Sequence, residues 1–361
     1  MRKFIQILSG TAILATAFVL AAFATLLLPL HSEAKPRPQP VFDNNAWVAS
    51  WDYESGLNEA RTISSQLTSV SYFGAALDKQ GHVIVLGDAK DLAQASLPRY
   101  RTVITRYLSV VNDVYENPSD PKGQTKLKDT DVLEDLLATP ESRQAHIQDL
   151  FQTMKASGYT GLEIDYERVW HNPLVAFRYV KFIQELAQAA EKENIPLRII
   201  LEPSVPANHL VFPAGPEYVI MCYNLYGTHT KEAGPKADKE FIDTVLSRMD
   251  RLPRPHSIAF ATGGCVWESG KPVRFVTEKE ARQLQAKTGA KAVRDETSGA
   301  LSFTSQKGQE TLTCWYADAE TLNQWKHQAL EHGTDGISLW RLGDNFHIAE
   351  YYPGLVNNKE R

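Results

Sequence analysis

Short hydrophobic runs recur along the chain from about residue 46, and segments with a helical repeat of apolar positions separate most of them. Eight runs have the length and composition of β-strands, namely residues 46–51, 69–77, 101–108, 158–167, 196–204, 217–227, 256–264 and 336–343. Residues 173–194 show the helical pattern, with apolar side chains at three- and four-residue steps. Strands that alternate with helices favour parallel pairing, and eight such units predict an α/β fold closed into a (β/α)8 TIM barrel.

Two segments do not fit a regular repeat. Residues 110–131 are predicted as a polar loop after the third strand. Residues 265–314, after the seventh strand, contain a helical pattern followed by two β-like runs joined at a Ser-Gly turn. We interpret this segment as a small α+β insertion, because a strand and a closing helix still follow it. Loops at the carboxyl ends of barrel strands are where substrates bind.

The N-terminus has the pattern of an export signal. Three residues, "MRK", precede a run from Ile5 to Leu30 without any charged residue. This run is long enough to span a bilayer. Cleavage after Ala24 or Ala34 would release a secreted protein, whereas an uncleaved segment would anchor the protein in a membrane, and both alternatives place the remainder outside the cytoplasm.

The pattern divides the chain into four parts. They are a signal peptide or signal anchor (1–34), a Pro-rich linker (35–45), the TIM-barrel domain (46–350) and a C-terminal tail (351–361).

Composition and charge exclude several functions. The 361 residues carry a net charge of −5 without a basic cluster, so nucleic acid is not an expected partner. We predict no metal and no cofactor, because the histidines are scattered and the cysteine spacing matches no zinc pattern.

The chain has three cysteines, and two of them, Cys265 and Cys314, flank the expected insertion. Either these two form a disulfide, or all three, including Cys222, are small buried hydrophobic residues.

The fourth predicted strand has an unusual distribution of charge. Three acids alternate with three apolar residues: Glu163, Asp165 and Glu167 with Leu162, Ile164 and Tyr166. Every second side chain of a β-strand points to the same face, so the three acids share one face and the three apolar residues share the other. The apolar face fits the side of a barrel strand that packs against helices, so the acids should point into the barrel. Neighbouring carboxylates favour a bound proton. We therefore expect a protonated Glu167 at the barrel mouth, where it can serve as a general acid.

These residues resemble a known family. Residues 160–167 resemble the D-G-x-D-x-D-x-E signature of glycoside hydrolase family 18, the chitinase-like hydrolases. "MCYNLYG" resembles the family's sixth strand, and "GISLWRLG" resembles its eighth. The resemblance covers about residues 45–350, and residues 314–345 are most similar to the branch of bacterial spore-cortex and cell-wall N-acetylglucosaminidases. Many members of the family also carry an insertion after strand seven.

The resemblance implies retaining hydrolysis of a glycan that contains N-acetylhexosamine, with the substrate's 2-acetamido oxygen as the nucleophile. It implies Glu167 as the general acid and base, Asp165 as the group that orients the acetamide, and Tyr223 as a donor to the acetamide carbonyl. The implied substrate-binding residues are Glu163, Met221, Asn224 and Trp340, of which Trp340 forms the floor of a sugar subsite.

The sequence departs from the family pattern at Thr160, Glu163 and Asn224, where the family has Asp. These departures bear on rate and pH optimum more than on reaction class. We expect the polysaccharide to be peptidoglycan or a chitin-type glycan, with bacterial cell wall favoured. A non-catalytic, lectin-like barrel and an endo-β-N-acetylglucosaminidase acting on N-glycans are the alternatives, and endo or exo action and oligomeric state stay open.

Overall fold

The computed structural model describes residues 42–87, 104–117 and 125–351. The expected leader, most of the expected linker and residues 352–361 of the expected tail lie outside the described residues. Within the described ranges, no helix combines the length and the apolar character needed to cross a membrane.

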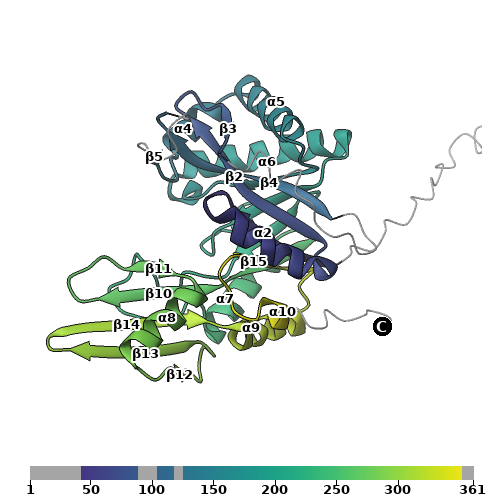
Figure 1. Ribbon diagram of the computed structural model, residues 1–361. Coiled ribbons are helices and arrows are strands. Elements are labelled where there is room, and N and C mark those ends of the chain that lie inside the picture. Colours follow the sequence, from purple (N-terminus) through teal and green to yellow (C-terminus); the bar gives the residue numbers. More distant parts are fainter. Residues whose placement is uncertain (1–41, 88–103, 118–124, 352–361) are drawn as a thin grey trace, which may run out of the picture. The chain divides into compact units, whose positions relative to one another are not determined.

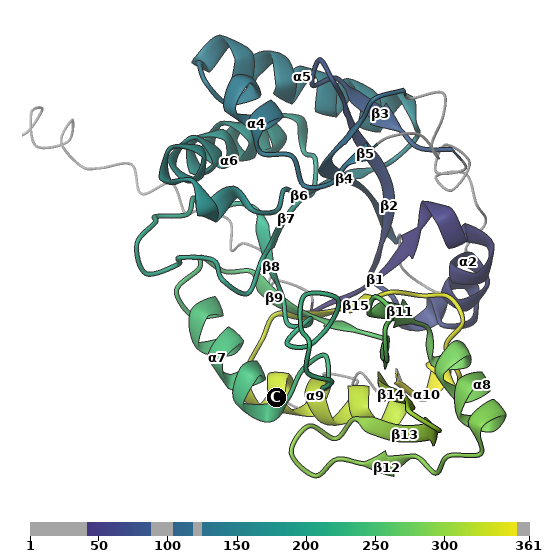
Figure 2. The ribbon, with the colours of Figure 1, turned by 90° about the vertical axis from the view of Figure 1, so that its left-hand side faces the viewer.

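Eight parallel strands close into a barrel, which confirms the predicted fold class (Figure 2). Pairing runs from β1 through β2, β4, β6, β7, β8, β9 and β15 and back to β1. The strands are β1 (Asp43–Ala49), β2 (Ser69–Asp78), β4 (Thr105–Tyr115), β6 (Gly161–Asp165), β7 (Leu197–Leu201), β8 (Glu217–Met221), β9 (His256–Ala261) and β15 (Gly336–Trp340). Two short antiparallel strands extend the barrel wall: β3 (Val83–Val85) beside β2, and β5 (Thr125–Lys126) beside β4.

Helices pack around the outside of the barrel (Figure 2). They are α2 (Tyr53–Thr62), α4 (Asp131–Leu136), α5 (Pro140–Ala156), α6 (Pro173–Glu193), α7 (Lys239–Met249), α9 (Ala319–His332) and α10 (Ile348–Tyr351). Three single 3₁₀ turns are η1 (Ser50–Asp52), η2 (Ser64–Gln66) and η3 (Val169–His171). Helix α6 matches the segment predicted from the helical repeat, and it begins at a local signal: Asn172 caps it by accepting a hydrogen bond from the Leu174 amide at 3.0 Å.

The third barrel strand differs from its prediction. It was expected at 101–108, followed by a polar loop, but β4 continues to Tyr115. The polar residues after position 110 did not look like a strand, yet Val110 and Val114 pack into the core and the extension pairs with β2 and β5. Tertiary pairing overrides the local polar pattern here.

The insertion after β9 forms its own antiparallel sheet in the order β11-β10-β14-β13-β12 (Figure 1). Its elements are β10 (Gly263–Glu268), β11 (Arg274–Val276), α8 (Glu278–Thr288), β12 (Val293–Arg294), β13 (Leu301–Lys307) and β14 (Glu310–Ala317). The sheet therefore starts two residues earlier and ends three residues later than the expected 265–314.

The three cysteines are buried free thiols, so the disulfide alternative is wrong for this structure. Cys265 lies opposite Trp315 on β14, and Cys314 lies opposite Val266 on β10. Adjacent residues of a strand point to opposite faces of the sheet, which separates the two sulfur atoms.

The main hydrophobic core lies between the barrel and its helices, where Leu162, Ile164 and Tyr166 are almost fully buried. The inside of the barrel holds polar side chains as well as a second apolar cluster. Its buried polar side chains include Asn45, Ser71, Ser109, Glu163, Arg198, Ser257 and Ser338. Buried polar groups need hydrogen-bond partners, and this requirement shapes the candidate site.

Candidate active site

The two faces of β6 separate apolar from acidic side chains. Leu162 and Ile164 are buried in the helix-facing core, whereas Glu163 and Asp165 lie buried on the barrel side. Glu167 follows two residues after β6 ends, at the carboxyl end of the barrel strands. The structure thus brings together the three acids that the alternation placed on one face.

Glu163 is fully buried and surrounded by donors. Its Oε1 accepts from Trp47 Nε1 at 2.6 Å and from the Ser109 hydroxyl, and its Oε2 accepts from the Ser71 hydroxyl at 2.8 Å. The guanidinium of Arg198 lies 3.2 Å from the same Oε2. Both oxygens are therefore engaged, and these contacts fix the position of the Glu163 side chain.

Arg198 balances more than one carboxylate inside the barrel. Its Nε lies 3.3 Å from Glu217 Oε2, and its Nη2 donates to the Ser338 hydroxyl at 2.6 Å. Its planar group also faces the rings of Trp47 and Tyr107. Burying an arginine is costly, and this arrangement offsets the cost with paired charges and ring faces.

Asp165 is buried but incompletely paired. No described residue donates a hydrogen bond to its Oδ1. Burial, and then the charge of Glu167, raise the pKa of Asp165 well above its usual range. Burial therefore favours the protonated form of Asp165, and its Oδ1 has no hydrogen-bond partner among the described residues.

Glu167 forms an ion pair with Lys128, from the segment that joins β5 to α4. The expected protonation of Glu167 stays a prediction. Asp165, the deeper and less solvated acid of the two, is the carboxyl group whose pKa burial raises.

Residues of β4 hold the backbones of Glu167 and Lys128 in place. Asn112 Oδ1 accepts from the Glu167 amide at 2.9 Å, and Asn112 Nδ2 donates to the Glu167 carbonyl at 3.1 Å. Asp113 Oδ1 accepts from the Lys128 amide at 2.8 Å. The extension of β4 past residue 108 therefore supplies the supports for both partners of the ion pair.

An aromatic and apolar cluster lies inside the barrel and reaches the carboxyl ends of β8 and β15. Met221, at the end of β8, and Tyr223 pack with Trp47, and Trp340 packs against this cluster. The Trp340 ring lies 4.9 Å from Phe73 and 6.0 Å from Trp47, centroid to centroid. Half-exposed Trp340 thus presents an apolar ring beside the acids, as a sugar platform requires.

Tyr223 stays a neutral phenol. Burial, followed by the charges of Asp165 and Glu167, raises the pKa of Tyr223 well above its usual range. Its hydroxyl is therefore a hydrogen-bond donor close to the acids. Asn224, in contrast, is exposed, and its Oδ1 accepts from Lys236 Nζ at 3.4 Å.

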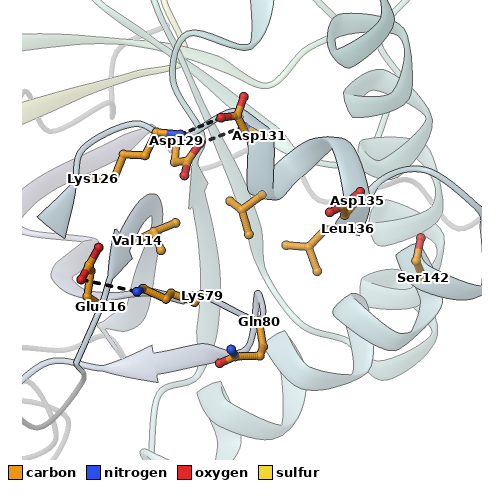
Figure 3. Close-up of a pocket in the computed structure, with 11 residues that line it drawn as sticks. Lys79, Gln80, Val114, Glu116, Lys126, Asp129, Asp131, Asp135, Leu136 and Ser142 are labelled. Carbon is orange, nitrogen blue, oxygen red and sulfur yellow. Dashed lines mark hydrogen bonds and ion pairs between the residues drawn. The ribbon is translucent and has the colours of Figure 1, made fainter.

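A separate hollow of about 640 Å³ lies between the β2–β3 turn, β5 and α4 (Figure 3). Three of the four carboxylates that line it are paired with lysines: Asp129 and Asp131 with Lys126, and Glu116 with Lys79. No aromatic residue is among those that line it. It lacks the acids of β6 and a face for stacking a sugar, so we do not assign the chemistry to it.

No group of three or more His, Cys, Asp or Glu side chains that could hold a metal occurs in the described ranges. The candidate chemistry can be carried by the carboxyl groups and Tyr223 alone.

Sequence reasoning missed four residues that shape the site: Trp47, Asn112, Lys128 and Arg198. Two of them carried a usable signal. Trp47 alternates with outward-facing residues of the first strand, and Arg198 is a lone charge inside an apolar strand. Lys128 and Asn112 had none, because both lie in the segment expected to be a loop.

Comparisons with known proteins agree with this geometry. The sequence model described as "Glycosyl hydrolases family 18" matches residues 47–345. The chain is 22% identical over 346 residues to the "Uncharacterized glycosylase YvbX" of Bacillus subtilis (strain 168), which covers 91% of this chain and 94% of that protein.

Two solved structures share the fold. The Bacillus cereus spore cortex-lytic enzyme SleL superposes with a TM-score of 0.70 at 18% identity, over 88% of this chain and 74% of that one. A chitinase from Chromobacterium violaceum superposes with a TM-score of 0.71 at 18% identity, over 86% of this chain and 97% of that one.

Proposed function

Because the chain belongs to glycosyl hydrolases family 18 and is a glycoside hydrolase, we propose that it cleaves β-1,4 bonds in a glycan that contains N-acetylhexosamine. We propose a retaining, substrate-assisted mechanism in which the 2-acetamido oxygen is the nucleophile. The observation that carries this proposal is the buried Oδ1 of Asp165, an acceptor without a protein donor beside Glu167. The N–H of a 2-acetamido group supplies the missing donor.

The proton needed for leaving-group departure starts on Asp165. When a sugar binds, Asp165 accepts the acetamide N–H, and its proton passes to Glu167. Glu167 protonates the leaving oxygen as the acetamide oxygen forms a bond to the anomeric carbon. The ionised Asp165 then lies beside the positive charge of the cyclic intermediate and stabilises it.

The second half of the reaction uses the same groups. Glu167, now a carboxylate, removes a proton from a water that attacks the anomeric carbon, and the ring of the intermediate opens to restore the acetamide. Tyr223 donates to the acetamide carbonyl oxygen, which holds it near the carbon it attacks. Trp340 supports the apolar face of the sugar, with Met221 in the wall of the same cluster.

We favour the glycan of bacterial cell walls as the substrate. Support comes from the resemblance of residues 314–345 to the cell-wall branch and from the fold shared with an enzyme described as spore cortex-lytic. The fold shared with a chitinase keeps chitin as the competing substrate. The export pattern of residues 1–34 supports action outside the cytoplasm, in secreted or membrane-anchored form.

Glu167→Gln tests the reaction. We expect turnover of N-acetylglucosamine oligomers to fall by about 10²- to 10⁴-fold, because the amide cannot transfer the proton. The matched control is Glu193→Gln, an exposed carboxylate at the end of α6 that should leave turnover unchanged. Full activity of the Glu167→Gln variant would sink the proposal, and so would glycan binding without product between about pH 4 and 8.

Product analysis tests the mechanism and the substrate. Chitin oligomers and peptidoglycan are incubated separately with the protein, and the products are weighed by mass spectrometry. Proton NMR of the first products should show the β-anomer, as retention requires. An α-anomer at early times would contradict the participation of the acetamide.

A further inference from the structure

A small pocket lies between Trp340 and the insertion. Its volume is about 160 Å³, and its lining includes Lys236, Phe275, Glu280 and Arg341. Because Trp340 also packs against the cluster that contains Tyr223, the pocket adjoins the proposed sugar platform. Neither the proposed reaction nor the residues assigned to it use this pocket.

Lys236 is a buried cation that lacks a counter-ion. Its exposed fraction is 7%, and its Nζ donates to Asn224 Oδ1 at 3.4 Å and lies 4.5 Å from the centre of the Phe275 ring. No carboxylate of the described residues forms an ion pair with it. An ammonium has three hydrogen-bond donors, and here it makes one long hydrogen bond and one contact with a ring face. Its remaining donors lack acceptors, and a buried charge without a partner is costly.

The other charged groups of the pocket are already engaged. Arg341 Nη1 lies 2.6 Å from Asp52 Oδ2. Glu280 Oε2 accepts from the Thr277 amide at 2.9 Å, as part of the cap of α8. Lys236 therefore is a cation of the lining without an ion-pair partner among the described residues. Burial lowers the pKa of Lys236, as expected for an amine without an anion beside it.

We propose that this pocket binds a carboxylate carried by a substituent of the sugar at Trp340, namely the lactyl group of an N-acetylmuramic acid unit. This inference rests on the proposed function, whose two candidate glycans differ in this group: cell-wall glycan carries it and chitin does not.

The volume of about 160 Å³ is sufficient for a small substituent such as a lactyl group. A stem peptide attached to the lactyl group converts its carboxylate into a neutral amide. The pocket therefore favours glycan strands from which the peptides have been removed.

The test compares ligands on the Glu167→Gln protein by isothermal titration calorimetry. The ligands are a peptidoglycan tetrasaccharide without peptides, its methyl ester, a chitin tetrasaccharide, and a tetrasaccharide whose carboxylates belong to uronic acid. We expect the free acid to bind about ten- to a hundred-fold more tightly than its ester, as for a charge-assisted hydrogen bond. Equal affinities for acid and ester would overturn the proposal, and uronic acid binding as tight as the lactyl ligand would overturn its assignment to the lactyl group.

Substitutions link the preference to Lys236. In the Lys236→Met variant the affinity ratio of acid to ester should fall to near one, and Lys236→Arg should retain most of it. Lys231→Met removes an exposed charge from the same loop and should leave the ratio unchanged. An unchanged ratio in Lys236→Met overturns the proposal. A loss of affinity for acid and ester alike would indicate a structural role and overturn it equally.

Turnover by the unsubstituted protein separates this inference from the proposed function. Hydrolysis of acid and ester at equal kcat/KM would uphold the glycosidase and reject the carboxylate pocket. If none of the ligands is hydrolysed, the proposed function fails, and the calorimetric ratio still decides whether the pocket recognises the carboxylate.

Discussion

Lys128 forms an ion pair with Glu167 at the mouth of the barrel. The lysine reaches the acid from a segment 39 residues earlier in the chain. The charges of Lys128 and Glu167 also affect the pKa values of Asp113, Asp165 and Glu202. Lys128 therefore lies among four carboxyl groups, these three and that of Glu167. The ammonium offsets their mutual repulsion and lowers the pKa values of Asp113, Asp165 and Glu202 against the effect of burial.

Replacing Lys128 by Met should move the alkaline limb of the pH–activity profile to higher pH. The ammonium of Lys128 lowers the pKa of Asp165, against the larger effects of burial and Glu167, so its loss should raise that pKa further. The measurement is kcat/KM against pH on an N-acetylglucosamine oligomer. Lys126→Met is the control, because Lys126 pairs with Asp129 and Asp131 instead. Superimposable profiles for Lys128→Met and the unsubstituted protein would refute this role.

Asp165→Asn should lower kcat by about 10²-fold or more while the protein stays folded. Burial and the charge of Glu167 raise the pKa of Asp165 and so favour its neutral form. A neutral amide of the same shape therefore costs little stability, yet it can neither pass a proton to Glu167 nor stabilise the positive intermediate. Steady-state kinetics and thermal unfolding are measured together. A large fall in the unfolding temperature with unchanged kcat would show that the role is structural.

Arg198→Met should destabilise the barrel by about 3–5 kcal/mol. The substitution leaves Glu163 and Glu217 buried without their counter-ion. Urea unfolding gives the free energy directly. A second substitution, Glu163→Gln, should recover part of the loss, because it removes one of the charges left unpaired.

An exposed arginine provides the comparison. Arg254 pairs with Asp335 at the surface, so Arg254→Met should change stability by about 1 kcal/mol or less. Similar losses at positions 198 and 254 would contradict the assignment of Arg198 as the counter-ion of the barrel interior.

His146 should make the protein less stable as the pH falls. Burial lowers the pKa of His146 to about 4, from an ordinary value near 6.5. The stabilising effect of its neutral form is fully present above pH 6.5, where folded and unfolded chains both carry a neutral imidazole. It is lost as the pH falls from 6.5 to 4, because only the unfolded chain takes up a proton, and the loss amounts to about 3 kcal/mol.

The His146→Gln variant isolates this contribution. An amide can replace the hydrogen bond between His146 Nε2 and the Tyr166 hydroxyl, which is 2.7 Å long. The free energy of unfolding should then decline less steeply between pH 6.5 and 4 than in the unsubstituted protein. Parallel slopes for the two proteins over this range would contradict the prediction.

The amino-acid sequence determined the architecture and the direction of the acids. The strand and helix periods predicted eight βα units, and the apolar back of residues 162–166 directed Glu163, Asp165 and Glu167 into the barrel. These inferences succeed because the spacing of apolar and polar side chains within one strand or helix can be read from neighbouring residues in the sequence. The same logic failed at β4, where pairing with β2 and β5 keeps a polar segment extended.

Only the tertiary structure decided which partners surround the acids. Arg198 and Trp47 contact Glu163, Lys128 pairs with Glu167, and burial raises the pKa of Asp165. The partners of these acids come from other strands and loops, at separations from 35 to more than 100 residues. Ionisation depends on distance through space and on burial, and neither can be read from the spacing of residues along the chain.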